Sequence, residues 1–155
     1  MATNFLWGTV GSVVHLLTTE LNSLASGSGT AYGSEVGAAN DPQLGTLYLH
    51  IASNSLAFTS SSYVKVFFVP STTTASGATY PTYTSGSSYK LAESNYLAGV
   101  IYINPATQSS NVVDETLPNV IMPAGFFKTI LVNQAGVMLP ASGNTLDFYP
   151  TPTQY

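Results

Sequence analysis

The sequence of 155 residues contains no cysteine and no arginine. Without cysteine the chain forms no disulfide and offers no thiolate as a nucleophile or metal ligand. Its only lysines are Lys65, Lys90 and Lys128, whereas proteins that bind nucleic acids present clusters of lysine and arginine. The net charge of −4 also repels a polyanion. We therefore expect no nucleic-acid partner.

Charge of either sign is scarce. Only 6% of the residues are charged, against about 25% in an ordinary globular protein. Hydrophobic residues make up 45% of the chain, and serine, threonine, glycine, asparagine and proline dominate the rest. A surface built of hydroxyls, amides and backbone is weakly hydrated, which favours lasting contact with a partner protein.

Long hydrophobic runs are also missing. No window reaches the roughly 18 apolar residues that span a bilayer, and the first twenty residues, MATNFLWGTVGSVVHLLTTE, lack the basic flank and apolar run of a signal peptide. We expect a soluble protein that is made in the cytoplasm and has no membrane partner. The length fits one domain.

The segment 13–24, VVHLLTTELNSL, predicts one short helix after a possible N-cap at Ser12. Two β-branched valines and two threonines weaken its helix propensity, so a partly extended segment is the alternative. Its apolar residues recur at helical spacing: Val13, Leu16, Leu17, Leu21 and Leu24.

Beyond this segment the hydrophobic period changes to two, which is typical of strands. In the clearest case, Leu47, Leu49 and Ile51 alternate with polar or aromatic neighbours. Seven or eight short strands separated by turn residues predict an all-β, single-domain, jelly-roll-like β-sandwich. The strands are expected within residues 44–52, 63–70, 98–105, 117–125, 126–133 and 144–149, with weaker ones near 30–36 and 111–117 and a further short pairing segment near 137–139.

Three regions fall outside this pattern. Residues 71–89 are rich in serine, threonine, glycine and tyrosine, and we expect them to form a projecting loop. Residues 1–12 and 150–155 are expected to be terminal arms around a sandwich domain at 13–149, and both could lie on a neighbouring molecule.

The residues that carry chemistry are few and follow no catalytic pattern. The sequence has two histidines, His15 and His50, but it lacks the G-x-S-x-G motif that carries the nucleophilic serine of many hydrolases. Asp114 and Glu115 are adjacent, so in a strand they point to opposite faces and cannot flank one glycosidic bond. We expect a non-enzymatic protein without cofactor or metal. The turn at 40–45, NDPQLG, is the one candidate for a weak calcium site.

Tyrosine is plentiful in the long loop, at Tyr80, Tyr83 and Tyr89. Stacking aromatic rings without neighbouring cations could contact sugars or another protein. The alternative interpretation, of equal weight, is that these tyrosines are exposed in a polar loop and bind nothing.

The last third of the chain resembles a widespread family of small virion proteins of tailed bacteriophages. The shared features lie in residues 117–150, LPNVIMPAGFFKTILVNQAGVMLPASGNTLDFYP: a proline before the penultimate long strand, an N-x-x-G turn, and a strand that starts with ASGNTL. Three earlier blocks sit where that family has a Leu-rich start, an aromatic-aliphatic strand and a strand ending in proline: LTTELNSLASGS, LYLHIASNSLAF and VKVFFVPS. The chain departs from the family by its low charge, so no ion-pair contact is carried over.

The resemblance implies a jelly-roll-like decoration or cement protein that binds the outside of an icosahedral head as a homotrimer and cross-bridges major capsid protein subunits. We expect the partner contacts at Phe5, Leu6 and Trp7 of the N-terminal arm and at Tyr155. The rival reading is a receptor- or glycan-binding module of a tail fibre or baseplate that uses Tyr80, Tyr83 and Tyr89.

Overall fold

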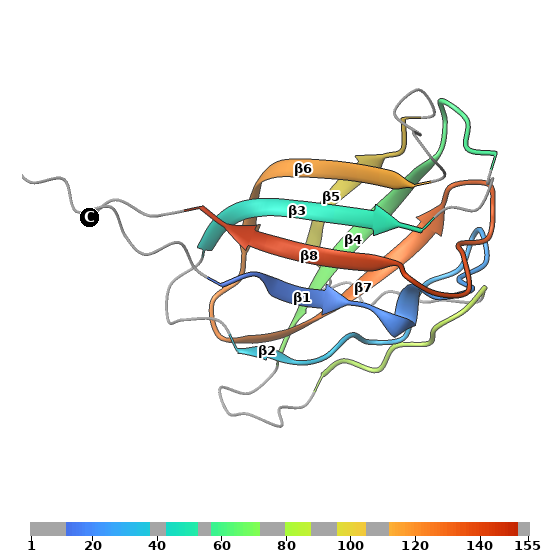
Figure 1. Ribbon diagram of the computed structural model, residues 1–155. Coiled ribbons are helices and arrows are strands. Elements are labelled where there is room, and N and C mark those ends of the chain that lie inside the picture. The colour runs from blue at the N-terminus through green and yellow to red at the C-terminus, as the bar shows by residue number, and fades with distance from the viewer. Residues whose placement is uncertain are drawn as a thin grey trace, which may run out of the picture.

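The structure, a computed structural model, describes residues 12–37, 43–52, 57–71, 80–87, 96–104 and 112–151. These residues form a β-sandwich of two four-stranded antiparallel sheets, as the strand periodicity predicted (Figure 1). The first sheet has the order β1 (Val14–Leu17), β8 (Thr145–Pro150), β3 (Gln43–Ile51) and β6 (Val113–Met122). The second sheet has the order β2 (Val36–Gly37), β7 (Phe126–Gln134), β4 (Tyr63–Pro70) and β5 (Tyr96–Tyr102).

The strand pairing folds the chain back on itself. β1 pairs with β8, β2 with β7, β3 with β6, and β4 with β5, all antiparallel. In each of these four pairs, a strand from the first half of the chain lies beside a strand from the second half. Pairs β3–β8 and β4–β7 then join these ribbons into the two sheets.

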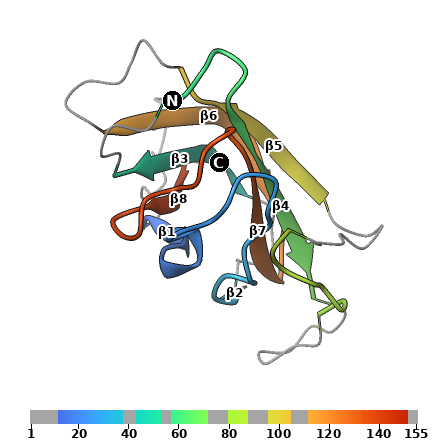
Figure 2. The same ribbon diagram turned by 90° about the vertical axis from the view of Figure 1, so that its right-hand side faces the viewer.

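The core lies between the sheets and is apolar. On β3 the alternation expected from the sequence is confirmed, because Leu47, Leu49 and Ile51 are fully buried while their neighbours are partly exposed. Leu146 and Phe148 of β8 bury their side chains on the same side of the first sheet. Figure 2 shows the two sheets as separate layers that approach each other where β5 and β6 meet.

The helix predicted for residues 13–24 is wrong, and the alternative of a partly extended segment is confirmed. Val14–Leu17 form strand β1, and only Thr19–Leu21 form a short 3₁₀ turn. The register of β1 on β8 shifts between His15 and Leu17, which is a bulge, and Leu16 and Leu17 are both buried. A bulge can send two successive side chains into the core, and here it imitates the spacing of a helical face. The open backbone edge of β8 and the β-branched Val14 favour the strand.

Strand β6 replaces the two separate strands expected at 111–117 and 117–125. It runs through Pro118, and Asn119 has a left-handed backbone with φ 60°. Opposite this pair the register of β3 shifts between Gly45 and Leu47, so the chain forms a bulge there instead of a break. Pro118 lacks an N–H group and is tolerated because β6 is an edge strand, as the sequence indicated. The segment 137–139 is not a strand.

The projecting loop expected at 71–89 is also corrected where the structure describes it. Residues 80–87 run along the outer face of the second sheet, where Gly86 bridges to Gly29. The arms were expected at residues 1–12 and 150–155, and residues 1–11 and 152–155 of them lie outside the described residues. The start of the C-terminal arm is corrected, because Pro150 belongs to β8 and the backbone N–H of Thr151 donates to the carbonyl of Leu44. None of the helical segments in the described part of the chain is long or apolar enough to cross a membrane.

Candidate binding surfaces

The two loop tyrosines that the structure describes cover the second sheet. Tyr80 and Tyr83 pack with Tyr32 over a small apolar cluster on the outer face of β4 and β7. The ring centroids of Tyr32 lie 5.9 Å from Tyr80 and 5.3 Å from Tyr83. We call these three rings the tyrosine cover. The residues beneath it are Phe67, Val69, Ile130 and Val132.

Polar contacts fix the tyrosine cover in place. The Tyr32 hydroxyl donates to the carbonyl of Pro81 over 2.7 Å, and the Tyr80 hydroxyl donates to Glu35 over 2.8 Å. The ammonium of Lys128 lies 4.8 Å from the centroid of the Tyr80 ring, within cation–π range. Burial and the bond to Glu35 raise the pKa of Tyr80 well above its ordinary value. These rings stabilise the fold, which leaves only part of their surface for a partner.

The other residues predicted to contact a partner cannot be placed. Phe5, Leu6, Trp7, Tyr89 and Tyr155 lie outside the described residues. Their role stays a prediction. Asn40 and Asp41 of the possible calcium turn lie outside as well, and the described ranges contain no cluster of three or more histidine, aspartate or glutamate side chains that could hold a metal ion.

A groove opens at one corner of the sandwich between the edge strands β5 and β6. The two strands touch at Gly99, where a Cβ atom would lie 2.2 Å from Cδ2 of Leu117, and the backbone N–H of Asn104 donates to Glu115 over 2.9 Å. Toward the start of β5 the strands separate around a cavity of about 540 Å³. We call it the edge groove; it is lined by Phe68, Tyr96, Leu97, Ala98, Asn119, Val120, Ile121, Pro123 and Ala124.

The edge groove is apolar and its rim is exposed. None of its lining residues is charged. Tyr96 and Ile121 are each 63% exposed and Leu97 is 54% exposed, so three large apolar side chains stand around the opening. A concave apolar site with exposed aromatic and aliphatic rims is the usual form of a protein contact with a central anchor.

Strand β5 differs from the other three edge strands. β1 is short and bulged, β2 has two residues, and β6 carries two carboxylates, Pro118 and a bulge. These are the devices that keep sheet edges from pairing with other chains. β5 also carries a bulge, at Ala98, but it is seven residues long, YLAGVIY, and has neither charge nor proline. Among the described strands none pairs with the free side of β5, so this edge is the least protected of the four against an added strand.

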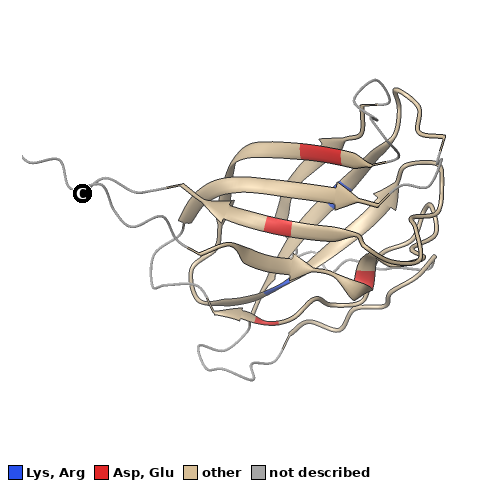
Figure 3. Cartoon of the chain, viewed as in Figure 1, with Lys and Arg blue, Asp and Glu red and all other residues tan. Residues whose placement is uncertain are grey.

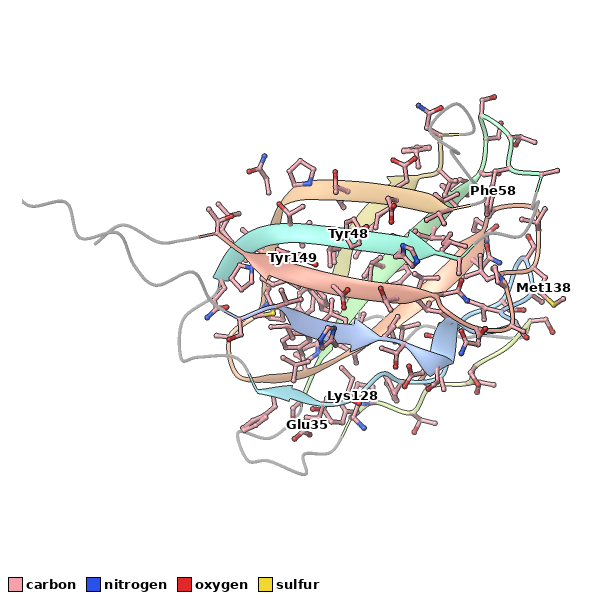
Figure 4. The ribbon with its side chains drawn as sticks, in the orientation of Figure 1. Glu35, Tyr48, Phe58, Lys128, Met138 and Tyr149 are labelled. Atoms are coloured by element: carbon pink, nitrogen blue, oxygen red, sulfur yellow. The ribbon has the colours of Figure 1, made fainter. Side chains whose placement is uncertain are left out.

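The outer face of the first sheet is polar and carries both histidines. Nδ1 of His15 lies 2.7 Å from Asp147 on β8, and Nδ1 of His50 lies 2.7 Å from Asp114 on β6. The Tyr48 hydroxyl donates to the same oxygen of Asp114. We call this surface the tyrosine–histidine face. Its second aromatic residue is Tyr149, whose ring meets that of Tyr48 edge-on at 5.9 Å (Figure 4).

These contacts shift two pKa values on this face. The bond to Asp114, followed by partial burial, raises the pKa of Tyr48 to about 12. The bonds from Tyr48 and His50 together outweigh partial burial and lower the pKa of Asp114. The neighbouring residue, Glu115, points away to Asn104. The expected opposite orientation of this acidic pair is confirmed.

Charge is divided between the sheets. Among the described strands, those of the first sheet carry Asp114, Glu115 and Asp147, and those of the second carry Lys65 and Lys128 (Figure 3). The sequence placed His50 on the polar side of its strand, which is confirmed, but it gave no sign that each histidine meets an aspartate. Those pairs depend on which strands are neighbours, and the strand alternation alone does not fix that.

No protein-family model, no curated protein and no solved structure matches this chain.

Proposed function

We propose that this chain is a non-enzymatic structural protein of a tailed-phage particle, a decoration or cement protein that binds the outside of the icosahedral capsid. In this proposal it cross-bridges neighbouring major capsid protein subunits, acts as a homotrimer and has a jelly-roll fold. The pairing of β1 with β8, β2 with β7, β3 with β6 and β4 with β5 carries the proposal. A double-sheet fold of eight strands is the jelly roll of many viral capsid proteins and lectins, and it agrees with the family that the C-terminal third resembles.

The contact surface in this proposal is the β5 edge with the edge groove beside it. An extended segment of the capsid protein adds to the open backbone edge of β5, and an apolar side chain of that segment enters the edge groove. Strand addition of this kind obtains affinity from main-chain hydrogen bonds and specificity from side-chain pockets. Because no charged residue lines the groove, the adhesion depends little on salt.

Such a protein stabilises the capsid by mass action. A ligand that binds only the expanded lattice shifts the equilibrium toward that lattice, by about 2.7 kcal/mol per site at a free concentration one hundred times Kd. No covalent bond is made or broken in this function. It needs a surface of complementary shape whose apolar area is buried on binding, and in this proposal the edge groove and its exposed rim are that surface.

The proposal is tested by binding purified protein to expanded and unexpanded heads of the parent phage, at low and at high salt. We expect binding to expanded heads only, with little loss at high salt. Leu97→Lys places a charge on the groove rim and should weaken binding by at least about tenfold. Met138→Lys is the matched control, because Met138 is also an exposed apolar residue, 58% exposed, outside the groove. Equal binding of both variants removes β5 from the interface, and no binding by the unaltered chain refutes the function.

The arms and the trimer need separate measurements. Deletion of residues 1–12 tests whether Phe5, Leu6 and Trp7 contribute to head binding. Light scattering on the purified chain tests the trimer, since a monomeric mass at working concentration contradicts it.

A further inference from the structure

No segment that the structure describes covers the tyrosine–histidine face, unlike the outer face of the second sheet. Its polar side chains come from all four strands of the first sheet, at successive cross-strand positions: His15, Asp147, Tyr48 and Thr116. Neighbouring strands lie about 4.8 Å apart, so this row crosses roughly 14 Å, enough for two or three sugar rings.

The two rings on this face are held in a fixed arrangement. Tyr48 is tied through its hydroxyl to Asp114, and its ring meets the edge of Tyr149 at an interplanar angle of 83°. Tyr149 is 44% exposed. An exposed aromatic ring whose neighbour is immobile offers an apolar plane at little entropic cost. The apolar C–H side of a pyranose matches such a plane.

The polar groups around the rings are mostly acceptors. Tyr48 and His50 both bond to Oδ1 of Asp114, and the Asp114 side chain is 49% exposed, so Oδ2 stays available to a ligand. With its proton on Nδ1, a neutral His50 also presents Nε2 as an acceptor. Asp147, 6% exposed, is held by His15 and by the Thr145 hydroxyl at 3.2 Å. Acceptors fixed in this way suit a ligand that is rich in hydroxyl donors.

The charge of this face selects among such ligands. Among the described strands of the first sheet there is no lysine, and the two aspartates make the face acidic. Sialylated, sulfated or phosphorylated glycans would meet like charge. The surface therefore fits an uncharged oligosaccharide.

We propose that the tyrosine–histidine face binds a neutral oligosaccharide, with one pyranose ring against Tyr149 and the hydroxyls of a following ring donating to Asp114 and His50. This is a second activity, separate from the capsid contact on β5. It differs from the glycan site predicted at Tyr80, Tyr83 and Tyr89, because Tyr80 and Tyr83 belong to the tyrosine cover.

A glycan array probed with the labelled full-length chain tests this proposal. The array should carry neutral β-linked galactosides, glucans and N-acetylglucosamine oligomers, which represent host-surface and mucus sources, beside sialylated and sulfated forms of the same sugars. We expect binding to one neutral group and none to the acidic forms. Absence of binding to every neutral glycan, or a preference for acidic ones, overturns the proposal.

Variants show whether the face is responsible. Tyr149→Leu keeps an apolar side chain but removes the ring, and should weaken affinity for the neutral sugar found on the array by at least about tenfold, whereas Tyr149→Phe should keep it. Tyr102→Leu is the matched control, because Tyr102 is an exposed tyrosine on β5. If Tyr149→Leu keeps its affinity for the sugar, the site lies elsewhere, whatever the result for Tyr102→Leu. Circular dichroism confirms that each variant is folded.

Discussion

The outer faces of the two sheets differ in burial: the described residues cover that of the second sheet and leave that of the first sheet exposed. On the second sheet, Ile130 and Val132 are fully buried beneath the tyrosine cover, although they point away from the main core. On the first sheet, the corresponding outward residues of β3 stay partly exposed and polar. A strand that is apolar on both sides needs a second cover, while a strand that alternates leaves one side for solvent or a partner. Tyr80 and Tyr83 therefore serve the fold, and the polar face of the first sheet is the one that we propose for binding.

Substitution of Ile130 should show this difference most strongly. Ile130→Ala removes a fully buried side chain and should lower the free energy of unfolding by about 2–5 kcal/mol. Thr46→Ala, on the outer side of β3, should change it by no more than about 0.5 kcal/mol. Urea denaturation followed by circular dichroism measures both. Similar losses for the two variants would mean that the outer faces are equally packed.

The tyrosine cover itself should have a smaller effect. Tyr83→Ala uncovers part of the cluster on β4 and β7, and loss of a half-buried ring should lower stability by about 1–2 kcal/mol. Tyr102→Ala, on an exposed ring, is the control. The same urea titration decides, and a Tyr83→Ala variant as stable as the unaltered chain contradicts the role given to the cover.

Acid should weaken the tyrosine–histidine face slightly. The pKa of Asp114 is lower in the folded chain than its ordinary value of 3.8. Its ionised form therefore stabilises the fold above pH 3.8, and this contribution is lost as the pH falls through the lowered pKa. Because Asp114 is half exposed, the loss should stay below about 1 kcal/mol. Asp114→Asn should flatten this part of the curve of unfolding free energy against pH, and an unchanged curve contradicts the assignment.

Alkali provides the most local signal, the titration of a single hydroxyl. Folding raises the pKa of Tyr48 from 10.0 to about 12, so the stabilisation is complete below pH 10.0 and is lost as the pH rises toward 12. Absorbance of tyrosinate should show late-titrating tyrosines in the native protein, and Tyr48→Phe should remove one of them. If the native titration is the same with and without this hydroxyl, Tyr48 is not bonded to Asp114.

The sequence predicted the strands that alternate cleanly and failed where a bulge intervenes. β3, with Leu47, Leu49 and Ile51 inward, follows from periodicity alone. In β1 the bulge after His15 buries Leu16 and Leu17 together, and this local irregularity imitated a helix. The β-branched residues of this segment were the local sign of an extended backbone, but the strand itself forms because β8 lies beside it.

The binding surfaces were less accessible to sequence reasoning. The two-sided apolar character of β7, with Ile130 and Val132 opposite Leu131, was a readable sign that a cover exists. The pairs His15–Asp147 and His50–Asp114 join residues more than sixty positions apart and require the strand order. The edge groove likewise arises from the separation of β5 and β6, which come from different sheets.

The most direct measurement of the central claim is a cryo-EM map of the mature parent particle, detailed enough to orient this sandwich. We predict density for it on the outside of the capsid, with β5 and the edge groove against the major capsid protein and the tyrosine–histidine face toward solvent. A particle without this density, or one in which β5 faces solvent, would contradict the account.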